Sequence, residues 1–162
     1  MPSPPWLLLH SAVRFGDTDA AGVMHFHQLL RWCHEAYEES LETFGIAPAS
    51  VFPVPAADRP TGLEPPAAAL PIVHCSADFR RPLVCGDPLE IELEPVRLDP
   101  SSFEVRYRFR RLRAGEEPQE AALGLTRHLA IEPASRRRCA LPEAIGRWLE
   151  AAAVAQGGIR PL

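Results

Sequence analysis

The chain has 162 residues, the size of one domain, and carries 21 acidic against 17 basic residues for a formal net charge of −4. That balance excludes general electrostatic binding to nucleic acid, which needs a basic face. Every basic residue is an arginine, so Schiff-base and Walker-type lysine chemistry is also excluded. No apolar run approaches the roughly 18 residues of a membrane span, and the run at 6–9 is too short for a signal peptide. We therefore expect a cytosolic protein.

The N-terminal part is predicted to contain a strand, a loop and one long helix. Residues 6–15 alternate weakly between apolar and polar side chains, and a loop follows at 16–22. From His27 to Phe44 the apolar residues recur at helical spacing, with glutamates on the opposite side, and Gly45 is a typical C-terminal helix stop. Small and apolar residues cover so much of this helix that we expect it to pack against a sheet.

Residues 47–71 contain seven prolines and are predicted to be a loop, since proline disfavours both a helix and a central strand. The segment is long for a compact domain. It is therefore either a functional lid or an insertion without fixed structure.

The remainder is predicted to be mostly β-structure. Segments 73–79, 89–94 and 103–109 alternate with period two, which predicts strands with one buried and one solvated face. A further strand is expected at 120–132, where four apolar side chains share one face: Leu123, Leu125, Leu129 and Ile131.

A turn at 99–102 joins two of these strands, and the resulting hairpin would set a row of glutamates against a row of arginines. A terminal helix is expected at 142–155, opened by Pro142. The order of one strand, one long helix and four strands predicts an α+β domain with an antiparallel sheet wrapped round one central helix.

Four cysteines lie far apart in the sequence, at Cys33, Cys75, Cys85 and Cys139, and none belongs to a CxxC pair. In a reducing compartment such residues behave as small buried apolar side chains. We expect no metal site.

The loop before the long helix carries the residues most suited to chemistry. Asp17 and Asp19 lie two positions apart in a segment bounded by Gly16 and Gly22. One interpretation is structural, with the carboxylates capping turns and Gly22 supplying a positive φ. The other is catalytic: free N–H groups at the helix start polarise a carbonyl while a carboxylate attacks it or activates water.

This D-x-D-x-x-G loop resembles the signature of the 4-hydroxybenzoyl-CoA thioesterase family of hotdog-fold proteins. The resemblance continues through segments 34–38, 70–74 and 85–87 and covers about residues 8–142. It is strongest to the 1,4-dihydroxy-2-naphthoyl-CoA thioesterases of phylloquinone biosynthesis in cyanobacteria, chiefly in the His-Glu-Ala-Tyr-Glu run at 34–38.

The resemblance implies one hotdog domain over residues 1–162 that hydrolyses an aromatic acyl-CoA thioester. CoA is then part of the substrate, and no metal or redox cofactor is needed. Two alternatives remain. One is a thioesterase for another acyl-CoA, such as 4-hydroxybenzoyl-CoA or a short-chain acyl-CoA. The other is a non-catalytic hotdog protein that binds acyl-CoA.

The resemblance also implies roles for single residues. Asp19 matches the position of the family's catalytic carboxylate, which acts as nucleophile or general base. Phe26 matches the position whose backbone N–H contacts the thioester carbonyl in the family. Gly22 lets the chain pass close to the substrate. The sequence departs from the usual pattern at His25 and His27, where tyrosine and asparagine are common.

Three further residues are candidates for substrate binding. His34 is either a surface histidine of the helix or a partner for a hydroxyl group on the acyl ring. His74 and Ser76 share a strand face and either line the pocket from a neighbouring subunit or have structural roles. Some of the arginines are expected to bind the CoA phosphates.

An open sheet of about five strands has an unpaired edge, so we expect a homo-oligomer. The resemblance to hotdog proteins, which pair two sheets edge to edge, implies a dimer of dimers.

Overall fold

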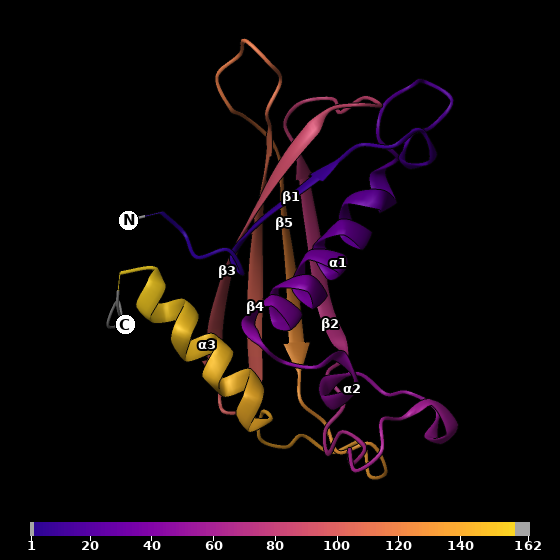
Figure 1. The fold of residues 1–162 in the computed structure, drawn as a ribbon, viewed down its shortest axis with the longest axis vertical. Coiled ribbons are helices and arrows are strands. Elements are labelled where there is room, and N and C mark those ends of the chain that lie inside the picture. Colours follow the sequence, from indigo (N-terminus) through magenta and orange to yellow (C-terminus); the bar gives the residue numbers. More distant parts are fainter. Residues whose placement is uncertain (1, 158–162) are drawn as a thin grey trace.

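The computed structural model describes residues 2–157, which form a five-stranded antiparallel sheet and three α-helices (Figure 1). The strands are β1 (Leu8–Ala12), β2 (Ile72–Phe79), β3 (Pro88–Asp99), β4 (Ser102–Arg111) and β5 (Gln119–Leu129). They lie in the order β1-β3-β4-β5-β2, and each neighbouring pair is antiparallel. β1 and β2 are therefore the two edges of the sheet.

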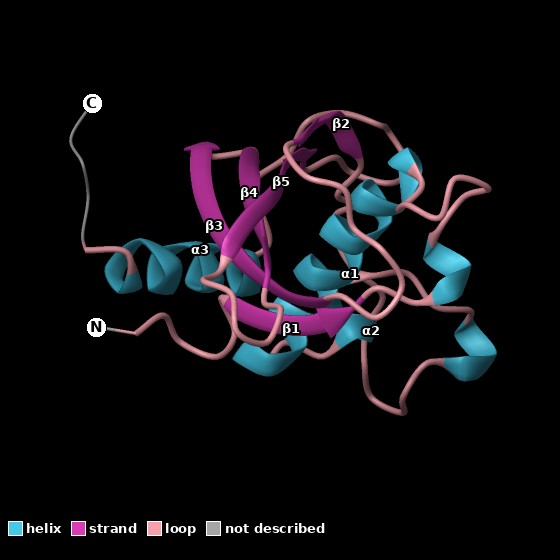
Figure 2. Ribbon diagram, turned by 90° about the horizontal axis from the view of Figure 1, so that it is seen from above, coloured by secondary structure: helices cyan, strands magenta, loops and turns pink. Residues whose placement is uncertain are grey.

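The long helix α1 (Phe26–Phe44) lies in the concave face of the sheet, which curves around it (Figure 2). His25 caps its start, and Gly45 ends it in the left-handed conformation with φ +109°. Leu29, Cys33 and Ala36 form its buried line toward the strands. The predicted helix, its stop at Gly45 and the α+β architecture are confirmed.

The contact between α1 and β5 is close. A Cβ atom at Gly124 of β5 would lie 2.5 Å from the Cys33 Sγ of α1, which is nearer than two such atoms can approach. Gly124 therefore lets the helix settle onto the strand.

The β3–β4 hairpin has the predicted register. Glu90 pairs with Arg110, Glu92 with Arg108 and Glu94 with Arg106, and ion pairs join the members of each pair. Both charged rows lie on the convex face of the sheet, turned away from α1. The apolar rows of the same strands are buried beneath α1.

The proline-rich segment is more ordered than predicted. It contains a short helix α2 (Pro48–Val51) and a 3₁₀ turn at Ala56–Asp58, so the expectation of no helix there was wrong. Pro48 occupies the first turn of α2, where its missing N–H would have had no intrahelical acceptor. A second 3₁₀ turn (Phe15–Asp17) precedes the catalytic loop candidate.

The terminal helix α3 (Glu143–Ala155) begins directly after Pro142, as predicted. Its Trp148 is fully buried and donates from Nε1 to the Ser40 hydroxyl of α1 at 3.1 Å. The Gln156 side-chain amide donates to the Leu93 carbonyl, which lies just past the residues of β3 that pair with β1. In this way α3 covers that part of β3.

One expectation about strand faces was wrong, and another gains detail. The expected buried face of β2 is exposed in this chain, where Val73 and Phe79 are 54% and 50% exposed. β2 lies at the edge of the sheet, and all its residues except Ala77 are exposed. On β5, Leu123 and Leu125 share one face as predicted; this face is the convex one, because the small side chains opposite are needed beneath α1.

The expectation of four buried cysteines was also wrong. Only Cys33 is buried, and burial raises the pKa of its thiol. Cys75 and Cys85 are exposed, and Cys139 is partly buried. Across residues 2–157, no group of three or more His, Cys, Asp or Glu side chains is placed to hold a metal ion, and no helix is long and apolar enough to cross a membrane.

Candidate active site

The Asp19 loop is a tight turn held by its own backbone. The Asp19 N–H donates to the Val23 carbonyl at 2.9 Å, and the Gly22 N–H donates to the Asp19 carbonyl at 3.0 Å. Gly22 has φ +79°, a conformation that side chains rarely adopt, so the turn depends on glycine there.

The Asp19 carboxylate is exposed to solvent and only half engaged. Its Oδ1 accepts a hydrogen bond from the Ala21 N–H at 2.8 Å. Its Oδ2 accepts none from the rest of the described chain. One oxygen therefore orients the group, and the other is free to attack a carbonyl carbon or to accept a proton from water.

The start of α1 presents a free backbone donor. The His25 N–H donates to the Asp17 carbonyl at 2.9 Å, and the His27 N–H donates to His25 Nδ1 at 3.4 Å. The Phe26 N–H, between them, donates to no acceptor within residues 2–157. Together with the positive end of the helix dipole, this N–H can stabilise a developing oxyanion.

Asp17 shapes the loop, as the sequence indicated. The Asp17 Oδ2 accepts a hydrogen bond from the Arg14 N–H at 2.8 Å, and the Asp17 carbonyl accepts one from the His25 N–H. The two departures from the family pattern, His25 and His27, lie side by side, with their Nδ1 atoms hydrogen-bonded. His25 is thus the helix cap, and its capping role explains a histidine at this position.

Asp19 and Phe26 line the same cleft, which has a volume of about 440 Å³. The other lining residues are Val23, Met24, Phe79, Arg80, Arg81, Pro82 and Leu83. The sequence analysis did not predict the wall formed by 79–83, which begins at the last residue of β2. The adjacent arginines at 80–81 were its one visible signal.

His34 lies two turns further along α1 and does not line that cleft. Its Nδ1 is 2.6 Å from the Glu38 Oε1, and its ring packs near Tyr37 and Phe52. His34 is partly exposed between α1 and the segment that follows α2.

His74 and Ser76 lie on the convex face of the edge strand β2 in this chain, away from Asp19. Ser76 lines a second cavity of about 880 Å³, which it shares with Asp78, the charged rows of the β3–β4 hairpin and the end of α3. The structure does not bring these two residues to the Asp19 cleft of the same chain. Their contribution to a neighbouring subunit's pocket stays a prediction.

Beneath His34 lies a buried pair of polar side chains that sequence reasoning did not single out together. Tyr37 and His128 have ring centroids 4.7 Å apart, and neither the Tyr37 hydroxyl nor His128 Nδ1 has a partner among the described residues. Burial, reinforced by the nearby charge of His34, lowers the pKa of His128 to about 4. His128 Nε2 is 2.9 Å from the Thr126 hydroxyl.

The sequence profile of the Thioesterase-like superfamily matches residues 13–149, which include the Asp19 loop, α1 and strands β2 to β5. The chain belongs to this superfamily. Its structural relatives are hotdog thioesterases, and the predicted fold class is confirmed.

Similar superfamily members come from marine cyanobacteria. A 1,4-dihydroxy-2-naphthoyl-CoA hydrolase from Prochlorococcus marinus (strain MIT 9303) is 59% identical over 94% of this chain and 95% of its own length. One from Synechococcus sp. (strain CC9311) is 56% identical over the full length of both chains.

Two solved structures share the fold. A candidate thioesterase from Prochlorococcus marinus MIT 9313 is 58% identical, with a TM-score of 0.82 over 91% of this chain and 96% of that one. A 1,4-dihydroxy-2-naphthoyl-CoA thioesterase from Synechocystis is 30% identical, with a TM-score of 0.75 over 88% and 94%.

Proposed function

We propose that this superfamily member hydrolyses 1,4-dihydroxy-2-naphthoyl-CoA to 1,4-dihydroxy-2-naphthoate and CoA. The observation that carries the proposal is that a half-free carboxylate, Asp19, and a free backbone donor, the Phe26 N–H, line one cleft. The activity named for the relatives at 56–59% identity supplies the substrate.

The two groups divide the reaction between them. The thioester carbonyl oxygen accepts a hydrogen bond from the Phe26 N–H, which stabilises the negative charge that develops on it. Asp19 Oδ2 either attacks the carbonyl carbon, giving an anhydride that water then opens, or takes a proton from an attacking water. In both routes the C–S bond breaks and the CoA thiolate leaves, so no metal or redox cofactor is required.

The cleft wall also suits the phosphates of CoA. Arg80 is exposed, and its guanidinium makes no hydrogen bond or ion pair with the described part of the chain. Arginine binds phosphate oxygens in bidentate fashion. Arg80 is therefore the arginine that we assign to this contact.

The proposal includes an assembly and a setting. The exposed edge strand β2 supports edge-to-edge pairing of two sheets, which would bring His74 and Ser76 near a neighbour's site, and two such dimers would form a tetramer. We further propose that the enzyme acts in phylloquinone biosynthesis, in the cytoplasm.

The first test is the substitution Asp19→Asn, assayed by thiol release. Asparagine is nearly isosteric and keeps an oxygen for the Ala21 N–H, but it is a poor nucleophile and base. We expect kcat to fall by about 100-fold or more, with an unchanged melting temperature. Near-wild-type kcat on the naphthoyl thioester would show that Asp19 is not the catalytic carboxylate.

A panel of acyl-CoA thioesters separates the proposed function from its alternatives. Preference for 4-hydroxybenzoyl-CoA or a short-chain acyl-CoA would replace the substrate but keep the reaction. Tight binding without thiol release would make the chain a non-catalytic acyl-CoA-binding protein.

A further inference from the structure

We propose that Asp87 is a positioning residue for the Asp19 loop. Its carboxylate, clamped by Arg113, holds segment 80–87 in the conformation against which the backbone after Asp19 is hydrogen-bonded. The inference rests on the proposed function in one respect, namely that Asp19 is the catalytic carboxylate.

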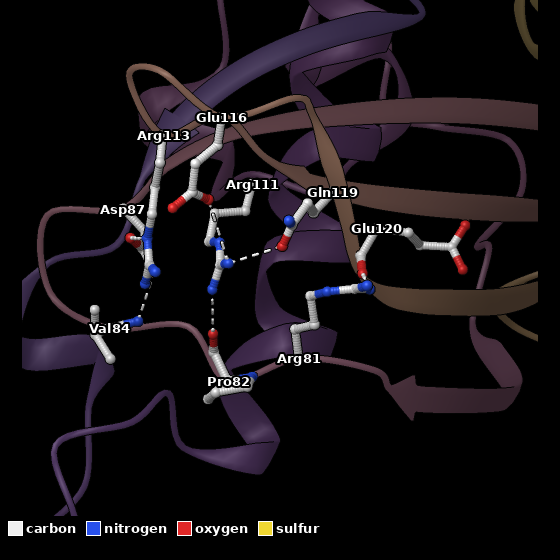
Figure 3. A network of polar contacts seen from close by, with 9 residues as sticks. All are labelled: Arg81, Pro82, Val84, Asp87, Arg111, Arg113, Glu116, Gln119 and Glu120. Atoms are coloured by element: carbon white, nitrogen blue, oxygen red, sulfur yellow. Dashed lines mark hydrogen bonds and ion pairs between the residues drawn. The ribbon is translucent and has the colours of Figure 1, made fainter.

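Asp87 is only 5% exposed and its carboxylate is fully engaged (Figure 3). Arg113 donates from Nε to Oδ1 at 2.7 Å and from Nη2 to Oδ2 at 3.0 Å. Oδ2 also accepts the Val84 N–H at 2.9 Å, which closes the loop 84–87 on itself. An ion pair of this geometry and burial is costly to break from one side.

A second group of contacts fastens the other end of the segment. Arg111, which is 9% exposed, donates from Nη1 to the Pro82 carbonyl at 3.4 Å and from Nη2 to the Gln119 side chain at 2.9 Å. Arg81 donates to the Glu120 carbonyl at 2.8 Å. Figure 3 shows Arg111 and Arg113 reaching segment 80–87 from the end of β4, and Arg81 reaching from the segment to Glu120 of β5.

The segment is joined directly to the Asp19 loop. The Met24 N–H donates to the Leu83 carbonyl at 2.8 Å, and Val23 forms a β-bridge with Val84. The Val23 carbonyl in turn accepts the Asp19 N–H at 2.9 Å. Two backbone contacts therefore lead from Val84, whose N–H the Asp87 carboxylate accepts, to the catalytic candidate Asp19.

The other side of the segment is anchored to the end of β1. The Gly86 N–H donates to the Val13 carbonyl at 2.8 Å, and the Val13 N–H donates to the Asp87 carbonyl at 2.9 Å. Asp87 thus links the backbone at Val13 with the backbone at Val84, and the Asp19 loop lies between these two segments of the chain. A displacement of about 1 Å at a reacting group lowers a rate by about 100-fold, so small relaxations here are expected to be visible in kcat.

The test compares Asp87→Ala with a matched control, Glu104→Ala. Glu104 is 6% exposed and is paired with Arg127, whose Nε lies 2.8 Å from Oε1, but it lies on the convex face of β4. Both substitutions leave an arginine without its carboxylate, so both should lower the melting temperature. We expect Asp87→Ala alone to lower kcat, by about tenfold or more, with KM changed less than about threefold.

A conservative variant and an activity-independent measurement complete the test. Asp87→Asn keeps one oxygen for the Val84 N–H and should recover part of the kcat lost in Asp87→Ala; it also serves if Asp87→Ala does not fold. Hydrogen exchange at the amides of Asp19 and Met24 should accelerate in the Asp87 variants and not in Glu104→Ala.

Equal kcat losses at Asp87 and Glu104, or a kcat within about twofold of wild type in Asp87→Ala, would overturn the proposal. Unchanged exchange at Asp19 and Met24 would do the same. If the wild-type protein hydrolyses no thioester, the proposed function fails, while the exchange comparison still decides whether Asp87 positions the loop.

Discussion

Asp19 and Phe26 meet in one cleft although seven positions separate them, because the intervening backbone folds back on itself. The His25 N–H returns to the Asp17 carbonyl, and the Met24 N–H is held by Leu83. The loop itself contributes little burial. The position of the carboxylate therefore depends on backbone hydrogen bonds more than on packing.

His34 should select for a hydroxylated acyl ring. Its Nδ1 lies 2.6 Å from the Glu38 carboxylate, which leaves Nε2 to donate a hydrogen bond to a ring hydroxyl or to accept one from it. His34→Ala should lower kcat/KM for the dihydroxynaphthoyl thioester by the equivalent of about 1–3 kcal/mol. Benzoyl-CoA, which lacks a hydroxyl, should be affected far less. Equal losses on both substrates would make His34 a structural residue.

His128 should make the folded state sensitive to mildly acidic pH. Its pKa falls from the ordinary 6.5 to about 4, so the unfolded chain binds a proton that the folded chain excludes. Stability from this group is complete above pH 6.5 and declines by about 3 kcal/mol as the pH falls to about 4. Denaturant unfolding across that range should show a flatter pH dependence for His128→Gln. Parallel curves for the two proteins would exclude His128 as the cause.

Among elements, α1 and β5 approach so closely at Gly124 that, of the glycines in residues 2–157, this one leaves the least room for a side chain. Cys33 and Gly124 are complementary, since the sulfur occupies the space that a Cβ at position 124 would take. This explains why β5 turns its small residues toward the helix and its leucines outward.

Gly124→Ala should therefore destabilise the fold by about 1–3 kcal/mol, because the new methyl group would collide with the Cys33 sulfur. Cys33→Ala should relieve the collision, so the double variant should be more stable than the sum of the two single changes predicts. Urea unfolding of the four proteins measures this coupling. Strict additivity would mean that the helix does not press on β5 at this point.

At the scale of the whole molecule, the sheet is protected unevenly. α3 covers part of β3 beyond β1, whereas β2 presents an open edge with exposed apolar side chains at Val73 and Phe79. Such an edge is a site for pairing with another chain. The surface of one chain therefore favours assembly through β2.

Light scattering at micromolar concentration should accordingly give the mass of a tetramer. Val73→Lys should shift it to a smaller species, because the charge would have to be buried at the paired edge. Leu98→Lys, at another exposed apolar position near the β3–β4 turn, is the matched control and should leave the mass unchanged. An active wild-type monomer would contradict the assembly.

Elements with local signals were predictable from the amino-acid sequence. The helical period and Gly45 located α1, and the alternation of glutamates and arginines located the β3–β4 hairpin with its register. Each of these depends on residues within one or two elements, where spacing alone specifies which side chains share a face. The candidate catalytic carboxylate in the loop at 17–22 came from the resemblance of that loop to a known family signature, since its spacing alone left a structural role open.

Features that join residues far apart in the sequence could be seen only in the folded protein. The buried face of β5 depended on how closely α1 approaches Gly124, and the exposure of β2 depended on its place at the edge of the sheet. The clamp on Asp87 depends on Arg113, which lies 26 positions away. Periodicity shows that the two faces of a strand differ. Which face is buried depends on what packs against the strand, and this is set only when the whole chain has folded.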